Sequence, residues 1–526
     1  MRGVYTSKSK IRKAVFTEVA RYAYNDGTKQ DFEAIPYKLL PGEVGNYRND
    51  IFLERAILGE RLRASMGLPT RTAAEMGPIS EGIENAEVSE NYYTPPLINV
   101  IKFACHACPE KRVFVTDGCQ GCLEHPCTEV CPKKCISIVN GRSHIDQSQC
   151  IKCGKCASAC PYSAIIKQER PCAKACGIGA IKSDELGRAD IDESLCVSCG
   201  QCLVSCPFGA IVDKGQIYQT IKAIKSDVPV IAAIAPSYVG QFTNDKSEYK
   251  VKPALKKLGF TDVVEVAIGA DLCTISEARD FIEEVPEKIP FMATSCCPAW
   301  AAMAKKLFPQ FKENISMALT PMVLTARLIK KEHPNCKIAF IGPCAAKKLE
   351  AMRRSIRSDV DFVLTFEELQ GILDAKNVSF DDIPESEYEL LNDASGLGNG
   401  FAVSGGVAEA VKNVIAKTNP DLEVKIQKAE GLADCKKMLM MAKAGRYDGF
   451  LLEGMGCPGG CVAGAGTVKA PAVTAKSVDK IVVDNKEKTP FDTKYVAMLN
   501  DLEEKETFSK DFSSNADEWE NDVFND

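Results

Sequence analysis

The second half of the chain alternates short apolar runs with longer amphipathic stretches. Four apolar runs predict buried strands, at residues 228–236, 262–270, 337–344 and 447–457. Amphipathic stretches around 252–260 and 297–307 predict helices between them. Alternation of strands and helices is typical of an α/β domain, to which we assign residues 216–480.

The two ends of the chain have different patterns. Residues 1–95 contain no cysteine, and their apolar positions predict helices around 11–24 and 50–66, so we expect a helical cap with no assignable chemistry. Residues 481–526 are predicted to form an acidic, solvated tail, because positions 501–526 hold ten acids and only Lys505 and Lys510. No apolar run in the chain approaches the roughly 20 residues of a membrane helix.

Composition narrows the class of protein. A length of 526 residues favours several domains, and a hydrophobic content of 45% is ample for their cores. The net charge of −6 gives no support for a nucleic-acid or anionic-membrane partner. The N-terminus has basic residues but no apolar stretch before Glu18, so we expect no secretion signal and predict a cytoplasmic protein.

Cysteine is the unusual component. All 25 cysteines lie between Cys105 and Cys461, and seventeen of them fall within residues 96–215. Disulfide-dense folds are small secreted domains, whereas repeated Cys-x2-Cys pairs followed by Cys-Pro are metal-ligand patterns. We therefore reject a disulfide scaffold and expect a reducing compartment.

Two runs in this segment have the full bacterial-ferredoxin spacing, Cys-x2-Cys-x2-Cys-x3-Cys-Pro. In such pairs the fourth cysteine of each run binds the cluster of the other run. This rule predicts one [4Fe–4S] cluster on Cys150, Cys153, Cys156 and Cys206. It predicts a second cluster on Cys196, Cys199, Cys202 and Cys160.

A second pair of runs is less regular. The tails CPKKCI, CPYSAI, CGIGAI and CPFGAI align, which indicates a fourfold repeat with one ferredoxin module threaded into another. The same crossover predicts a third cluster on Cys119, Cys122, Cys127 and Cys176. It predicts a fourth cluster on Cys105, Cys108, Cys172 and Cys131.

Other ligand arrangements stay open for these runs. Zinc also takes four thiolates, although the Cys-Pro endings favour clusters. His106 and His125 lie beside predicted ligands, and Cys135 occupies a position held by alanine in the sister repeats. The arrangement resembles the four-cluster iron–sulfur subunits of the dimethyl sulfoxide reductase type. Four clusters in line are expected to carry single electrons between a surface partner and a buried site.

Three cysteine segments in the second half lie too far apart for a local site: TSCCPAW (294–300), GPCAAKKLE (342–350) and EGMGCPGGC (453–461). Four of their cysteines can meet only inside a folded domain, around one metal centre. Together the segments resemble the signature segments of [FeFe]-hydrogenases, over about residues 226–470. The resemblance implies an α+β and α/β multidomain protein, in which ferredoxin-like modules precede a two-lobed α/β domain. That domain would bind the H-cluster, a [4Fe–4S] unit bridged by one cysteine to a two-iron subsite with CO and cyanide ligands.

The resemblance also assigns residues. It implies that four cysteines bind the [4Fe–4S] unit, with the last as the bridge: Cys297, Cys344, Cys457 and Cys461. Cys296 matches a proton-relay thiol, for which a passive core thiol is the alternative. The relay would continue through Ser316 and through Glu277 and Asp280, which share a helix face. The match at Asp280 needs a one-residue gap, and an exposed helix acid is an equal alternative there.

Further matches concern the walls of the cofactor site. Lys347 matches a lysine that hydrogen bonds one cyanide, and Met455 matches an apolar wall residue. The loop that contacts the other cyanide is matched by Ala235, Pro236 and Ser237. Two departures, Ala299 in place of glycine and Gly342 in place of methionine, resemble a divergent branch called group B. Three cysteines match no motif and are predicted to be core thiols: Cys273, Cys336 and Cys435.

The resemblance implies reversible H2 oxidation and proton reduction with a ferredoxin or flavodoxin partner, after maturation enzymes have supplied the diiron unit. No Gly-rich dinucleotide fingerprint lies between a strand and a helix, so direct NAD(P) chemistry is not expected. A hydrogen sensor is one alternative. A Nar-like iron–sulfur assembly carrier, without the diiron unit, is another.

Overall fold

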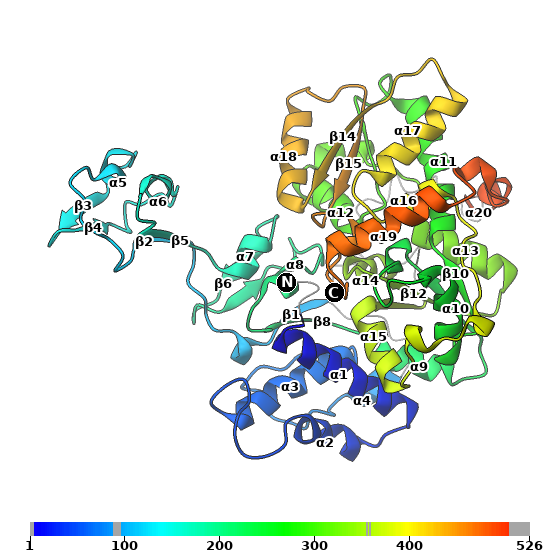
Figure 1. Cartoon of the computed structure of the whole chain (residues 1–526), viewed down its shortest axis with the longest axis horizontal. Helices are drawn as coiled ribbons and strands as arrows, with labels where there is room; N and C mark the ends of the chain where they lie inside the picture. The colour runs from blue at the N-terminus through cyan, green and yellow to red at the C-terminus, as the bar shows by residue number, and fades with distance from the viewer. Residues whose placement is uncertain (1–4, 88–95, 354–355, 357–358, 504–526) are drawn as a thin grey trace.

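The computed structural model describes residues 5–87, 96–353, 356 and 359–503 (Figure 1). The helical cap comprises residues 5–87 and contains α1 (Ser7–Tyr24), α2 (Lys29–Leu39), α3 (Ile51–Ser65) and α4 (Ile83–Glu87). Thr6 and Thr28 cap the first two helices by accepting hydrogen bonds from backbone amides in the first turn. The predicted helices at 11–24 and 50–66 are confirmed. None of the helices in the described ranges is long and apolar enough to cross a membrane.

The cap shares its core with the α/β domain. Helix α1 packs against α15 (Phe366–Ala375), and its buried Val15, Phe16 and Val19 belong to the same apolar cluster as the central sheet of that domain. A Cβ at Gly371 would lie 2.4 Å from the Cβ of Phe16, so the two helices touch where the glycine leaves room. The cap is therefore part of the folded body.

Residues 96–215 form two ferredoxin-like modules, one inserted into the other. The inner module, residues 112–168, contains β2 (Arg112–Val115), α5 (Pro126–Glu129), β3 (Ile136–Val139), β4 (Arg142–Ile145), α6 (Lys155–Ala159) and β5 (Ile165–Gln168). The outer module, residues 96–111 and 169–215, contains β1 (Ile98–Val100), α7 (Pro171–Ala175), β6 (Ile181–Ser183), β7 (Ala189–Ile191), α8 (Gln201–Ser205) and β8 (Ile211–Asp213). Strand β1 pairs with β8 and β2 with β5, both antiparallel, which closes each module.

The first lobe of the α/β domain is built on a parallel sheet in the order β10-β9-β12-β13. These strands are β9 (Val230–Ile234), β10 (Asp262–Glu265), β12 (Lys337–Gly342) and β13 (Phe362–Thr365). Around them lie α9 (Ile217–Ile224), α10 (Ser247–Lys257), α13 (Pro321–Glu332), α14 (Ala346–Ala351) and α15. All five residues of β9 are buried, as expected for a parallel strand covered on both faces.

The second lobe contains a smaller parallel sheet in the order β11-β15-β14. Its strands are β11 (Met292–Ala293), β14 (Lys425–Glu430) and β15 (Phe450–Met455). The remaining helices are α11 (Ala267–Glu284), α12 (Pro298–Leu307), α16 (Gly396–Gly400), α17 (Gly406–Thr418), α18 (Leu432–Lys443), α19 (Pro471–Asp484) and α20 (Leu499–Glu503). The predicted alternation of strands and helices is thus present in both lobes.

Two boundaries differ from the sequence predictions. The apolar run 262–270 is a strand only to Glu265, and helix α11 begins at Ala267, because a buried helix start is as apolar as a strand. The folded region also extends past residue 480: Leu499 and Leu502 are buried, and α20 packs on α13. The acidic residues 504–526 lie outside the described part of the chain.

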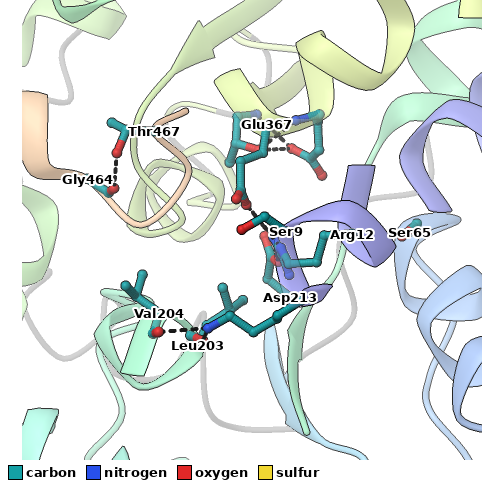
Figure 2. A network of polar contacts seen from close by, with 12 residues as sticks. Ser9, Arg12, Ser65, Leu203, Val204, Asp213, Glu367, Gly464 and Thr467 are labelled. Carbon is teal, nitrogen blue, oxygen red and sulfur yellow. Dashed lines mark hydrogen bonds and ion pairs between the residues drawn. The ribbon is translucent and has the colours of Figure 1, made fainter. Parts of the chain in front are cut away.

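A network of charged groups joins the cap, the outer module and the first lobe (Figure 2). Arg12 of α1 pairs with Asp213 at 3.3 Å and with Glu367 at 2.8 Å. On the other side of Asp213, the buried Lys348 lies 2.9 Å from Asp213 and 2.9 Å from Glu368. These contacts hold the end of the outer module against the α/β domain.

Candidate functional site

A central cavity of about 80 Å³ lies between the two lobes, where strands of both sheets end. The loops after β9, β11, β12 and β15 all reach it, because the carboxyl ends of parallel strands converge there. Those loops carry all three cysteine segments predicted to hold a metal centre. The segment 294–300 follows β11, a strand of two residues that the sequence pattern did not reveal.

The cavity gathers the residues assigned to the cofactor. The four predicted cluster ligands line it, as do Cys296 and Lys347. The predicted loop and wall residues line it too: Ala235, Pro236, Ser237 and Met455. Of the catalytic residues predicted from the resemblance, Glu277, Asp280 and Ser316 are absent from this lining and lie behind it.

The side chains of the cavity suit a sulfur-ligated cluster with polar ligands. Within the described residues, no group of three or more His, Cys, Asp or Glu side chains is close enough for a single metal ion, so the cysteines surround a space instead. Burial raises the pKa of Cys344 to about 11 and that of Cys461 to about 12. A cluster would have to displace those protons on binding. The buried Ser237 hydroxyl has no hydrogen-bond partner among the described residues, which leaves it free to bond a ligand in the cavity.

The wall of the cavity explains one departure from the family pattern. A Cβ at Gly342 would lie 2.5 Å from the ring of Phe340, two residues earlier on the same face of β12. Phe340 itself lines the cavity. The aromatic ring therefore occupies the space next to Gly342 that a larger side chain would need.

Lys347 is held by a buried carboxylate. Its Nζ lies 2.6 Å from Glu350, one helical turn along α14, and Glu350 also accepts a hydrogen bond from the Thr320 hydroxyl. Burial acts to lower the pKa of Lys347, but the Glu350 carboxylate outweighs it and the net pKa is raised. Lys347 therefore presents a positive charge to the cavity. The sequence pattern alone gives no signal for this role of Glu350, because an acid at that position is ordinary.

Glu277 lies behind Cys296 and is completely buried in α11. One carboxylate oxygen accepts the backbone N–H of Ser295 at 3.2 Å, while Oε2 has no hydrogen-bond partner among the described residues. Burial raises the pKa of Glu277 to about 7, against the lowering effects of Ser295 and Ser316. Burial is also the main cause that raises the pKa of Cys296, and the charge of Glu277 adds to it. The two groups are therefore close enough for the charge of Glu277 to affect the pKa of Cys296.

A second cavity, of about 300 Å³, lies beside Ser295, whose backbone N–H donates to Glu277. It is lined by Ser295, Ser316 and Asp280, together with Arg279 and Glu503. Burial raises the pKa of Asp280 to about 6, above its usual range. Of the three residues predicted for the proton route, Asp280 and Ser316 line this second cavity, and Glu277 interacts with both of them and with Cys296.

Two functional contacts were not predicted. The Gln201 side-chain amide, at the start of α8 in the outer module, donates a hydrogen bond to the sulfur of Cys457 at 3.0 Å. Glu453, fully buried on β15, accepts the backbone N–H groups of Gly405 and Ala408 at the start of α17. Gln201 follows Cys199 by two residues, but its target lies 256 positions away, so spacing alone gave no signal.

The structure corrects the predicted pairing of the ferredoxin cysteines. Helix α5 packs on α6 and α7 on α8, so the four runs combine as inner and outer modules. The charge of Cys206 helps to raise the pKa of Cys108 and Cys172, and Cys206 shares an apolar cluster with Cys105 and Cys172 in the outer module. Its predicted partners lie in the inner module, so the fourth-cysteine assignments are wrong.

The other three assignments change in the same way. The charge of Cys176 helps to raise the pKa of Cys196, Cys199 and Cys202. Cys131 lies with Cys135 and Cys150 in the core of the inner module. The remaining four cysteines then form a group of their own: Cys119, Cys122, Cys127 and Cys160. If the crossover rule is applied within each nested module, as the strand pairing indicates, it predicts these revised groups. Cys135, Cys273, Cys336 and Cys435 are buried, as predicted.

Comparison with known proteins agrees with this geometry. Residues 228–465 match the family described as "Iron only hydrogenase large subunit, C-terminal domain". The chain carries an iron-only hydrogenase-like domain. Residues 143–166 and 189–212 match the 4Fe-4S binding domain, so iron–sulfur motifs precede the hydrogenase-like domain.

Three curated proteins show the range of relatives of this hydrogenase-like chain. Iron hydrogenase 1 of Clostridium pasteurianum is 29% identical over 66% of this chain and 69% of its own length. The periplasmic [Fe] hydrogenase large subunit of Nitratidesulfovibrio vulgaris is 29% identical over 62% of this chain and 87% of its own. Cytosolic iron-sulfur assembly component 3 of Bos taurus is 26% identical over 44% of this chain and 59% of its own.

Proposed function

We propose that this protein is an [FeFe]-hydrogenase that interconverts H2 with protons and electrons. The observation that carries the proposal is the convergence of Cys296, Lys347 and four cysteines on one cavity between the lobes. In this proposal Cys297, Cys344, Cys457 and Cys461 would hold the [4Fe–4S] unit, and Cys461 would also be the ligand next to the diiron unit. When bound, that H-cluster supplies the site at which two protons and two electrons combine reversibly to H2.

The chain's own residues manage the protons. Cys296 holds a proton at the cavity wall, and Glu277 behind it exchanges that proton with the second cavity. A carboxyl with a pKa of about 7 suits this task, because both of its protonation states are populated near neutral pH. Ser316 and Asp280 line the second cavity, from which Glu277 regains its proton. Lys347 and the Ser237 hydroxyl are donors for the cyanide ligands.

Electrons are proposed to travel through four [4Fe–4S] clusters. The cluster nearest the cavity is the one on Cys176, Cys196, Cys199 and Cys202. Cys199 packs in the same apolar cluster as Cys297 and Cys344, and Gln201 contacts Cys457 directly. The outer-module cluster on Cys206 and the two inner-module clusters would extend the relay to a ferredoxin or flavodoxin in the cytoplasm.

A second function is favoured by one observation. The similarity to the cytosolic iron-sulfur assembly component of Bos taurus covers part of the same domain, so a Nar-like carrier without the diiron unit is the competing proposal. The two proposals differ in what the cavity contains. The group B-like branch, suggested by Ala299 and Gly342, concerns the turnover rate, catalytic bias and oxygen tolerance of the hydrogenase.

Infrared spectroscopy of protein matured with the diiron assembly enzymes tests the proposal. The hydrogenase predicts CO and cyanide bands, and their absence would support the carrier. Replacing Cys296 by Ala is expected to abolish hydrogen evolution while the bands remain. Cys435→Ala removes a buried thiol that does not line the cavity and serves as the matched control. Hydrogen evolution at the wild-type rate in Cys296→Ala would rule out the proton role.

A further inference from the structure

The inner module stands apart from the rest of the molecule. Figure 1 shows it at the left, beyond the outer module and joined through the ribbon of β2 and β5. Its elements pack on one another, and its apolar core, which includes Val113, Ile136, Ile145 and Ile165, contains residues of this module alone. Most of its surface is therefore open to other proteins.

One predicted cluster ligand reaches that surface. All 25 cysteines lie in the described part of the chain, and among them Cys153 alone is exposed. It sits in the loop before α6, with Cys150 and Cys156 beneath it. A cluster bound there would have one edge at the protein surface, where an electron can enter without crossing a layer of side chains.

Lysines surround the exposed ligand. Lys152 and Lys155 flank Cys153 in the sequence, and a Cβ at Gly154 would lie 3.3 Å from the Cδ of Lys167, which brings a third lysine to the same edge. Lys155 and Lys167 are exposed. The whole inner module holds seven lysines and arginines against four acids, whereas the chain has a net charge of −6. A thiolate-bound cluster is itself negative, so these cations offset a charge that would otherwise repel an acidic partner.

The inner module also exposes apolar side chains. Ile151 is 56% exposed and lies two residues before Cys153. Tyr162 and Leu123 of the inner module are also exposed large apolar residues, the latter at 97%. Transient protein contacts combine apolar anchors with a charged rim, and the rim charges chiefly raise the rate of encounter.

We propose that an acidic one-electron carrier protein docks on this electron port, defined as Ile151, Lys152, Cys153, Lys155 and Lys167. The inference rests on the proposed function and adds the place and the charge of the partner. In each encounter one electron passes from the reduced carrier to the oxidised cluster, or the reverse, and no covalent bond changes. Two such encounters supply or remove the two electrons of one H2.

Charge reversal tests the port. The variant Lys155→Glu with Lys167→Glu is compared with Lys10→Glu with Lys480→Glu, which makes the same charge change on exposed residues of α1 and α19. The Lys10 substitution also tests a second basic surface as a docking site, because Lys10 lines a basic groove between the cap and the outer module. The probe is a strongly acidic ferredoxin with two [4Fe–4S] clusters, and basic cytochrome c is the opposite-charge control.

Binding and turnover are measured separately. The port variant is expected to lose about tenfold or more in affinity for the ferredoxin and in ferredoxin-linked kcat/KM, with a weaker salt dependence of both. Its iron content and its hydrogen evolution with methyl viologen should equal those of the wild type. The proposed docking site would be refuted if the wild type and the port variant bound ferredoxin equally well, or if the control variant lost as much affinity as the port variant.

The outcomes also separate the port from the function. If wild-type protein evolves no hydrogen with methyl viologen but the port variant still loses ferredoxin binding, the hydrogenase proposal fails and the port stands. Ile151→Ser, which removes the apolar anchor without changing charge, should weaken binding at low and high salt alike. A loss confined to low salt would contradict the anchor role of Ile151.

Discussion

Lys348 offers the sharpest test of how the outer module is attached to the α/β domain. Its ammonium group is fully buried and donates hydrogen bonds to Asp213 at 2.9 Å, Glu368 at 2.9 Å and the carbonyl of Lys214 at 2.7 Å. Asp213 ends the outer module, whereas Lys348 follows Cys344 by four residues. Replacing Lys348 by Met keeps the side-chain volume but leaves the Glu368 carboxylate buried without a cation, while Arg12 still pairs with Asp213.

The cost of that change follows from the burial. Removing one partner of a buried ion pair typically destabilises a protein by about 3–5 kcal/mol. For a domain of roughly 150–250 residues each kcal/mol shifts the melting temperature by about 2–4 °C, so we expect a fall on the order of 6–20 °C. The control is Lys437→Met, which breaks an exposed pair with Asp434 and should cost at most about 1 kcal/mol. Scanning calorimetry of the cluster-loaded proteins measures both.

The pH dependence gives a second readout. Burial already raises the pKa of Glu368, and loss of the Lys348 charge must raise it further. A carboxyl whose folded pKa lies above its unfolded value destabilises the fold as pH rises through the unfolded pKa, so the deficit of Lys348→Met should shrink from pH 8 towards pH 5. Adding Glu368→Gln should recover part of the loss. A melting temperature like that of Lys437→Met, or a deficit that grows in acid, would refute the reasoning.

Two further predictions concern the proton and electron routes. Glu277→Gln keeps the shape and the Ser295 hydrogen bond but cannot exchange a proton, so hydrogen evolution should fall by about 10²–10⁴-fold with the infrared bands unchanged; wild-type turnover would contradict the relay. Lys8 of the cap donates to the carbonyls of Leu203, Val204 and Cys206, so its ammonium charge favours the reduced state of the neighbouring cluster. Lys8→Met should therefore make the midpoint potential of that cluster more negative in an EPR-monitored titration. Lys13→Met, on the same helix but paired with Asp374, is the control, and equal potentials in both variants would exclude the effect.

The ligand types and the sheet were largely predictable from local patterns. Each ferredoxin spacing extends over about ten residues, so it can be recognised in a short stretch of sequence. The same holds for β9, β12 and β15, because strands buried on both faces are continuous apolar runs. The wall of the central cavity was less predictable, because the position of the Phe340 ring beside Gly342 depends on which face of β12 points inward. The Gln201 bond to Cys457 depends on how two domains meet.

The sequence by itself determined which cysteines are available, that they come as four ferredoxin runs and three distant segments, and that an α/β domain follows them. Only the tertiary structure decided which cysteines are neighbours. The fourth cysteine of each run can reach any run that packs beside it, and that choice depends on strand pairing between β1 and β8 and between β2 and β5. Likewise, Glu277 takes its place behind Cys296 because α11 and the loop after β11 pack together, although the residues are 19 positions apart. Long-range packing sets these neighbours because it is governed by the burial of whole elements, which a local spacing does not encode.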